Sequence, residues 1–211
     1  MSLTFPRADI LTGLQFQVST PRIKPLWRQE MSRTAGGVTL VKDLGPLLWQ
    51  VSYLTRRLLR DRAGEVETDL LTLENGGQLF IGYDPARPFP ASDKVSVLSG
   101  VTVNVIHADR LALRLSGLPP AFVLTKGDWV SIDDGTNLHL LRAAETVTAA
   151  GTGLSPWFEV RPGLRPSIIA GQPVTLRYAP ALFMVDPGSV ERNADGRLYD
   201  TVSWTATQVI T

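Results

Sequence analysis

The chain has 211 residues, with 21 basic and 20 acidic side chains and no cysteine. This length fits one elaborated domain or two modest ones, and either can bury a substantial core. Balanced charge lacks the cationic surplus that drives phosphate contacts, so we expect no specific nucleic-acid partner. The absence of cysteine excludes disulfides, thiolate metal sites and cysteine nucleophiles. Stability must therefore come from packing and assembly.

The sequence also argues against membrane insertion. No run of apolar residues approaches the roughly 20 that a transmembrane helix needs, so we expect no membrane partner. Pro6, Arg7 and Asp9 interrupt the place where a signal peptide has its apolar segment. We therefore expect a protein made in the cytoplasm. The 18 glycines and 15 prolines are spread along the chain, which favours many short strands joined by turns.

The first strands are predicted from alternating apolar and polar residues. Leu14, Phe16 and Val18 alternate with polar residues, which predicts a half-buried strand, and Pro21 and Pro25 end its pairing. Two further strands are predicted at 38–41 and 47–54. In the second of these, Trp49, Val51 and Tyr53 share a large aromatic face that we expect in the core.

A helical period follows, in one place only. Five apolar residues are spaced four, three, four and three apart, which places them on one stripe of a helix. They are Leu59, Ala63, Val66, Leu70 and Leu73. We predict a helix over about 58–75, ended by Asn75-Gly76-Gly77, whose residues tolerate the left-handed conformation of a C-cap. A strand is predicted again at 78–84.

From Lys94 onward the pattern is strand and turn alone. Val101, Val103 and Val105 are predicted to face one way, and Leu111, Leu113 and Leu115 repeat the alternation after a hairpin connection at 107–110. Further strands are predicted at 128–132, 138–147, 156–161, 173–178 and 202–206. Spacing this regular is typical of a compact sandwich or a small barrel.

The sequence contains no catalytic motif. A serine nucleophile needs a histidine base, and only His107 and His139 are available, neither of them in a recognisable motif. We expect His107 in a turn and His139 on a strand, each solvent-facing or hydrogen-bonded. A zinc site would need more ligands than these two. We therefore expect no enzyme, no metal and no cofactor.

Paired carboxylates and glycine pairs have simpler interpretations. Asp133-Asp134 could act in a glycosidase, but with Gly135 and Asn137 the segment has the composition of a hairpin turn. The acidic residues of the helix are predicted to form its solvated face; they are Glu65, Glu67 and Asp69. Gly36-Gly37 and Gly76-Gly77 fit neither GxGxxG nor a P-loop, so we predict turns.

The tryptophans divide into two groups. Three lie on alternating strands and are predicted to pack in the core; they are Trp49, Trp129 and Trp204. Trp27 and Trp157 lie beside prolines, where their rings can reach a surface.

Two stretches of the sequence resemble proteins of tailed-phage tails. The first is similar to a recurring module of tail proteins and comprises Lys126 to Ile132, Leu138 to Arg142, Val160 to Pro166 and Gly171 to Val174. The second is similar to minor tail and distal tail proteins and comprises Leu48 to Tyr53, the predicted helix and Gly77 to Pro85. In those proteins a strand, a helix and a strand form part of the ring-forming domain at the tail tip.

The resemblance implies a mainly β structure with two domains. Residues 1–93 with 183–211 would form a β-sandwich-like ring domain that carries the helix, and residues 94–182 would form an inserted small β-barrel domain. The protein would then be a structural part of the virion tail tip, or baseplate. It would form a ring, as a homohexamer, and join the tail tube protein to the tail-tip hub protein.

Candidate subunit contacts lie in the mixed basic and apolar segment before residue 34. They are Arg22, Trp27, Arg28 and Arg33. The alternative function is a carbohydrate- or receptor-binding tail module, in which an exposed aromatic side chain such as Trp157 contacts glycan. A third possibility is a tail-associated hydrolase that uses Asp133 or Asp134.

Overall fold

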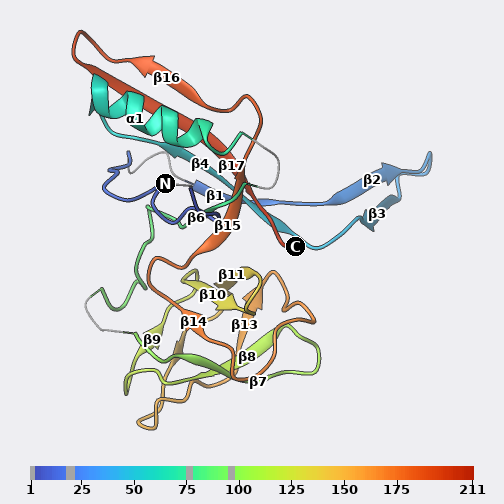
Figure 1. Ribbon diagram of the computed structural model, residues 1–211. Coiled ribbons are helices and arrows are strands. Elements are labelled where there is room, and N and C mark those ends of the chain that lie inside the picture. The colour runs from blue at the N-terminus through green and yellow to red at the C-terminus, as the bar shows by residue number, and fades with distance from the viewer. Residues whose placement is uncertain (1–2, 18–21, 75–77, 95–97) are drawn as a thin grey trace.

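A computed structural model describes residues 3–17, 22–74, 78–94 and 98–211 (Figure 1). Strands make up 41% of the chain, which confirms the prediction of a mainly β protein. One helix is found in these ranges, and it is neither long nor apolar enough to cross a membrane. The predicted strand residue Val18, Pro21 and the predicted helix end at 75–77 lie outside the described residues.

The larger sheet is antiparallel and has seven strands. In sheet order its main strands are β1 (Arg22–Leu26), β4 (Leu48–Leu54), β17 (Tyr199–Gln208), β15 (Ala181–Val185) and β6 (Phe80–Gly82). The short strands β5 (Leu58–Leu59) and β16 (Glu191–Ala194) also pair with β17. The predicted first strand is wrong in part, because residues 14–17 form no strand and the buried Phe16 makes only an isolated bridge to Thr55.

The centre of this sheet is aromatic, as the sequence predicts. Trp49, Val51 and Tyr53 on β4 are all buried, and their polar neighbours are only half-buried. On β17, Trp204 lies opposite Tyr53, and their ring centroids are 5.0 Å apart. Alternation of period two therefore gives one face of the sheet to the core.

The helix α1 (Arg60–Leu71) packs its apolar stripe against the sheet. Ala63, Val66 and Leu70 are buried, and Leu73 is buried just after the helix ends. The prediction is wrong for Leu59, the first residue of the predicted stripe. Leu59 belongs to β5 and is exposed, because the chain there is still paired with β17. The helix is thus shorter than the predicted 58–75.

The second sheet has six antiparallel strands around its own hydrophobic core. In sheet order they are β14 (Val174–Thr175), β10 (Trp129–Asp133), β11 (Leu138–Ala143), β13 (Phe158–Arg161), β8 (Ala112–Ser116) and β7 (Thr102–Ile106). A separate ladder joins β9 (Val123–Leu124) to β12 (Val147–Thr148). The strand ladders of the described residues do not close into a barrel, although an isolated bridge joins Thr102 to Pro173 at the two ends of the sheet.

Two details of the predicted alternation are wrong in this sheet. Val105 is exposed although Val101 and Val103 are buried, because a β-bulge between Val103 and Val105 shifts the register with β8. Leu111 precedes β8 and is also exposed, whereas Leu113 and Leu115 are buried as expected.

The two cores meet at a pair of tryptophans. Trp49 of β4 packs edge-to-face on Trp129 of β10, with ring centroids 5.0 Å apart. The indole nitrogen of Trp49 donates a hydrogen bond to the Leu140 carbonyl at 2.7 Å, and that of Trp129 donates to Asp84 Oδ2 at 2.9 Å. Both buried donors are therefore satisfied across the junction.

A hairpin projects from the body of the molecule (Figure 1). It consists of β2 (Gln29–Arg33) and β3 (Thr39–Asp43), which pair only with each other. Every residue of both strands is exposed. The predicted strand at 38–41 is thus a strand in large part, but it lies outside both cores.

The buried stripe of α1 gives a direct test of the fold. Leu70 is 2% exposed, whereas its neighbour Leu71 is 55% exposed. Replacing Leu70 with Asp places an unpaired charge in the core, so we expect a loss of roughly 4 kcal/mol in the free energy of unfolding. Thermal denaturation followed by circular dichroism measures it. Leu71→Asp is the matched control and should melt like the parent; equal melting of both variants would contradict the packing described.

Candidate functional site

The two histidines lie in different surroundings. His107 is in an exposed turn, with Nδ1 3.0 Å from Asp109 Oδ1. His139 is buried on β11, and its Nε2 is 2.7 Å from Asp134 Oδ2 and 3.2 Å from Ser167 Oγ. The described part of the chain holds no group of three or more metal-ligating side chains.

Serine, histidine and aspartate thus meet in one cluster, but not as a catalytic triad. Ser167 and Asp134 both contact the same imidazole nitrogen of His139. In a triad the carboxylate orients the imidazole through the opposite nitrogen, which leaves the first free to accept the serine proton. The hydrogen bonds to His139 therefore hold the turn that carries Asp134 and the loop that carries Ser167 against β11. Sequence analysis missed Ser167, because it comes from a loop 28 residues away from His139.

The turn at 133–137 is built by its aspartates. Asp134 Oδ1 accepts hydrogen bonds from the backbone N–H groups of Thr136 and Asn137, and Asp133 accepts one from Gly135. These bonds confirm the predicted turn. Burial works to raise the pKa of the Asp134 carboxyl, but the hydrogen bonds from His139 and the turn outweigh it and hold this pKa well below its ordinary value.

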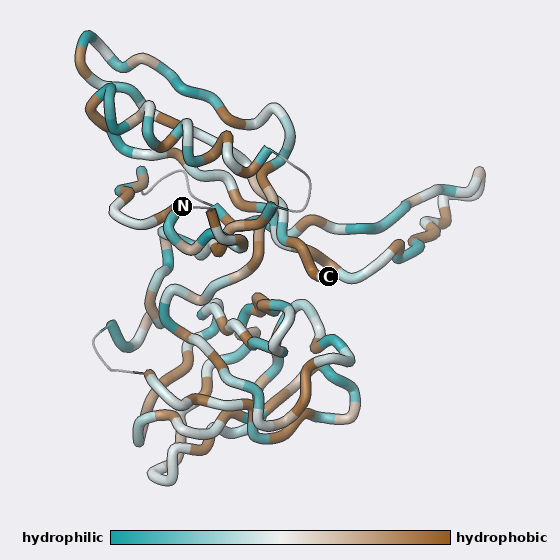
Figure 2. Tube along the Cα trace, viewed as in Figure 1, coloured by the Kyte–Doolittle hydropathy of each residue, from teal (hydrophilic) through white to brown (hydrophobic). Residues whose placement is uncertain are grey.

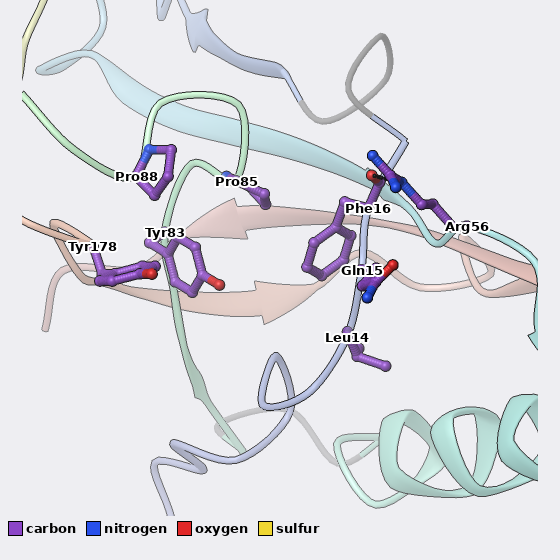
Figure 3. Close-up of a pocket in the computed structure, with 8 residues that line it drawn as sticks. All are labelled: Leu14, Gln15, Phe16, Arg56, Tyr83, Pro85, Pro88 and Tyr178. Atoms are coloured by element: carbon purple, nitrogen blue, oxygen red, sulfur yellow. Dashed lines mark hydrogen bonds between the residues drawn. The ribbon is translucent and has the colours of Figure 1, made fainter. Parts of the chain in front are cut away.

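Figure 3 shows a pocket of about 360 Å³ near the junction of the two cores. It is lined by Leu14, Gln15, Phe16, Arg56, Tyr83, Pro85, Pro88 and Tyr178. Tyr83 and Tyr178 form an edge-to-face pair at one end, with ring centroids 5.0 Å apart, and Arg56 Nε donates to the Phe16 carbonyl at the other. No carboxylate or imidazole lines the pocket, so its described lining offers no acid–base pair for catalysis.

The most exposed apolar surface belongs to residues 27–44, which we call the arm. Trp27, as the sequence predicts, carries an exposed ring, and Met31 is 70% exposed. Four more large apolar residues of the arm are exposed: Val38, Leu40, Val41 and Leu44. Met31 lies opposite Val41 in the register, so these two side chains share one face of the ribbon. A two-stranded ribbon is marginally stable when it stands alone in water.

The structure brings three of the four candidate contacts together on the arm. Trp27 and Arg28 immediately precede β2, and Arg33 is the last residue of β2. Arg22 lies apart from them, at the far end of β1 in the larger sheet. No carboxylate in the described ranges pairs with the side chains of Arg28 or Arg33. The arm therefore presents free guanidinium groups beside apolar side chains.

A groove runs along the base of the arm. Two hollows of about 500 and 590 Å³ meet there and share Pro46, Leu47, Pro162 and Gly163 as lining. Arg28 lines one hollow and Arg165 lines the other. Burial lowers the pKa of Arg165, and the positive charge of Arg28 lowers it further. Arg110 and Arg161 also line the two hollows, as do Asp43 and Asp109, so the groove combines apolar walls with charges of both signs.

The tryptophan predictions are confirmed, although the rings of Trp27 and Trp157 differ in how far they are exposed. Trp49, Trp129 and Trp204 are buried in the core. Trp157 is only partly exposed, because Arg114 lies over its ring at 4.8 Å from the centroid and His107 packs edge-to-face against it.

The buried Asp134 carboxylate predicts a pH-dependent stability. Because its pKa is lowered in the folded protein, it stabilises the fold above its ordinary pKa of about 4, and this contribution is lost as the pH falls toward the folded value. Asp134→Asn should lower stability by roughly 3 kcal/mol at pH 7 and flatten the acid limb. Urea unfolding between acidic and neutral pH measures both effects. Asp133→Asn, in the same turn but exposed, is the control, and an equal effect of the two changes would contradict this assignment.

No protein-family model matches this chain, and no curated protein matches it.

Proposed function

We propose that this chain is a structural protein of a phage tail tip, or baseplate, that forms a ring between the tail tube protein and the tail-tip hub protein. The observation that carries the proposal is the arm, a two-stranded ribbon whose apolar side chains, among them Met31, Leu40 and Val41, are covered by none of the described residues. A surface of this kind is covered when another protein chain packs on it. The resemblance to minor and distal tail proteins implies that this assembly is a ring at the tail tip.

The layout of the larger sheet supports the resemblance. The stretch Leu48 to Tyr53 corresponds to β4, the amphipathic segment to α1, and Gly77 to Pro85 contains β6. These three elements contribute to one hydrophobic core. A strand, a helix and a strand in this order are what the resemblance implies for a ring-forming domain.

We further propose the two-domain division, with a sandwich-like ring domain at 1–93 and 183–211 and an inserted small barrel at 94–182. Separate hydrophobic clusters support it, since one of them draws all its buried residues from 101–176. Three backbone hydrogen bonds join the ends of the second sheet: Val103 donates to Gln172 at 2.9 Å, Gly171 donates to Val103 at 2.7 Å, and Val174 donates to Val101 at 2.8 Å. A barrel would need these contacts to extend into a ladder.

The proposed structural role requires no catalytic group. The one Ser–His–Asp cluster shares a single imidazole nitrogen, and the pocket of Figure 3 lacks a proton-transferring group other than its tyrosines and Arg56. A ring needs no such chemistry. It needs two complementary surfaces and a body stiff enough to hold them at a fixed angle.

The proposal predicts rings of six, because the axis of the tail is sixfold in the proteins that the sequence resembles. Native mass spectrometry and electron microscopy of the purified protein, with and without tail tube protein, would show them. Met31→Asp places a charge on the apolar face of the arm and should abolish rings without lowering the melting temperature. Ile169→Asp, at a position 60% exposed outside the arm, is the control. A monomer in both conditions that also fails to reach tail tips would refute the proposal.

The second candidate is a carbohydrate- or receptor-binding tail module, and Trp157 is the observation that favours it. Its partly exposed ring, the Arg114 guanidinium over it and His107 beside it form an aromatic and polar surface on the second sheet. A glycan array distinguishes the candidates. A specific hit that Trp157→Ala removes would favour glycan binding, whereas a purely structural ring protein gives none.

A further inference from the structure

A second apolar patch lies where β5 pairs with the start of β17. Leu59 is 60%, Leu198 63% and Tyr199 41% exposed. Leu59 and Tyr199 are direct partners in the register, so their side chains lie on the same side of this two-strand pairing, and Leu198 precedes Tyr199 in the turn that leads into β17. We call these three residues the end patch. Three exposed apolar side chains at this one end of the sheet mark it as a contact surface.

The end patch is held rigidly. Arg192 Nε donates to Asp200 Oδ2 at 2.7 Å, and its Nη1 donates to Glu67 Oε2 of α1 at 3.1 Å. On the other side of the turn, Arg57 Nη2 donates to Asp195 Oδ1 at 2.9 Å. The hairpin that carries Leu198 is therefore tied to the helix and to the chain before β5. A preorganised surface loses little conformational entropy on binding.

The arm and the end patch lie at opposite ends of the molecule. In Figure 1 the arm projects to the right, and the turn between β16 and β17 lies at the upper left, beside the start of α1. Figure 2 shows hydrophobic residues at both places. A head-to-tail assembly needs two different surfaces of this kind on each chain, so that the first surface of one copy meets the second surface of the next.

Unpaired charges accompany both apolar surfaces. On the arm, Arg33 has no hydrogen-bond or ion-pair partner among the described residues. Beside the end patch, Asp61 in the first turn of α1 and the exposed Arg197 before Leu198 likewise have none within those ranges. The end patch thus carries unpaired charges of both signs. Arg33 and Asp61 are opposite charges that an interface with an apolar centre and a polar rim would bring together.

We propose that the arm of one copy of this chain binds the end patch of the next copy, with Met31 and Val41 against Leu59, Leu198 and Tyr199, and Arg33 beside Asp61. This inference rests on the proposed ring and names the surface that receives the arm. Strands of five residues at about 3.3 Å per residue let the arm reach roughly 17 Å, enough to span such a patch on a neighbour. Repetition of the same contact from copy to copy closes a ring when the rotation between neighbours is one sixth of a full turn, as the proposed sixfold ring requires.

The absence of cysteine makes this contact directly testable. A double variant with Met31→Cys and Leu198→Cys carries one thiol at each surface, and the two cannot meet within one chain. Oxidation, or a short bis-maleimide linker that tolerates imperfect disulfide geometry, should give a ladder of covalent multimers up to the closed ring. The matched control pairs Met31→Cys with Ile169→Cys, which is exposed to a similar degree. The control and the single variants should give no ladder.

Native mass spectrometry of the same samples distinguishes failure of the arm–end patch contact from failure of the proposed ring function. Rings without a ladder, or with an equal ladder in the control pair, would overturn this contact and leave the ring function standing. Failure to form rings would overturn the proposed function and this contact with it. As a second measurement, Arg33→Glu should raise the concentration needed for assembly roughly tenfold, and Asp61→Arg added to it should restore assembly. No restoration by the second change would contradict the Arg33–Asp61 pairing.

Discussion

The strand β17 runs from the end patch to the junction of the two cores. It pairs with β4, β15, β5 and β16, and at its centre Trp204 packs on Tyr53 in the core. Its first residue, Tyr199, belongs to the end patch. Just beyond its last residue, Thr211 donates from its backbone nitrogen to Asn137 Oδ1 of the second sheet at 2.7 Å. A single ten-residue strand therefore fixes the place of the end patch relative to the junction of the two cores.

The junction itself is polar as well as aromatic. Asp128 is fully buried, and Oδ1 accepts hydrogen bonds from Arg87 Nη2 at 2.6 Å and from the Ala91 backbone at 2.9 Å. Together with the Trp49–Trp129 pair, these contacts specify one orientation of the second core, because a buried carboxylate that loses its partners costs several kcal/mol. A protein that spans two neighbours in an assembly needs a junction that does not bend freely.

Local sequence pattern predicted the parts of the fold that depend on local periodicity. The stripe Ala63, Val66 and Leu70 and the aromatic face of β4 follow directly from periods of 3.6 and 2. Pattern failed where pairing partners decide the outcome. Leu59 has the spacing of the helix but pairs with β17, and the bulge before Val105 reverses the face of one residue. Neither partner is visible in a single segment.

The same limit applies to the candidate sites. Ser167 joins His139 from a loop far along the sequence, and no motif announces that contact. The composition of the arm identified its arginines and Trp27 as candidate contacts, but an apolar strand has the same pattern whether it faces its own core or another chain. Only its exposure in the folded molecule separates these two cases.

A ribbon with exposed apolar side chains also carries a risk of aggregation, because its open edges can pair with any similar strand. The arm carries features that reduce this hazard before assembly. Glu30 lies opposite Lys42 in the register, and Gln29 donates to Asp43 at 2.7 Å, so charged and polar pairs occupy the part of the ribbon nearest the body. Arg33 stands near the turn, where an edge-to-edge contact with a second arm would bring like charges together. In the proposed ring, self-pairing of arms would therefore be less favourable than binding of an arm to the end patch beside Asp61, and this difference would favour ordered assembly over aggregation.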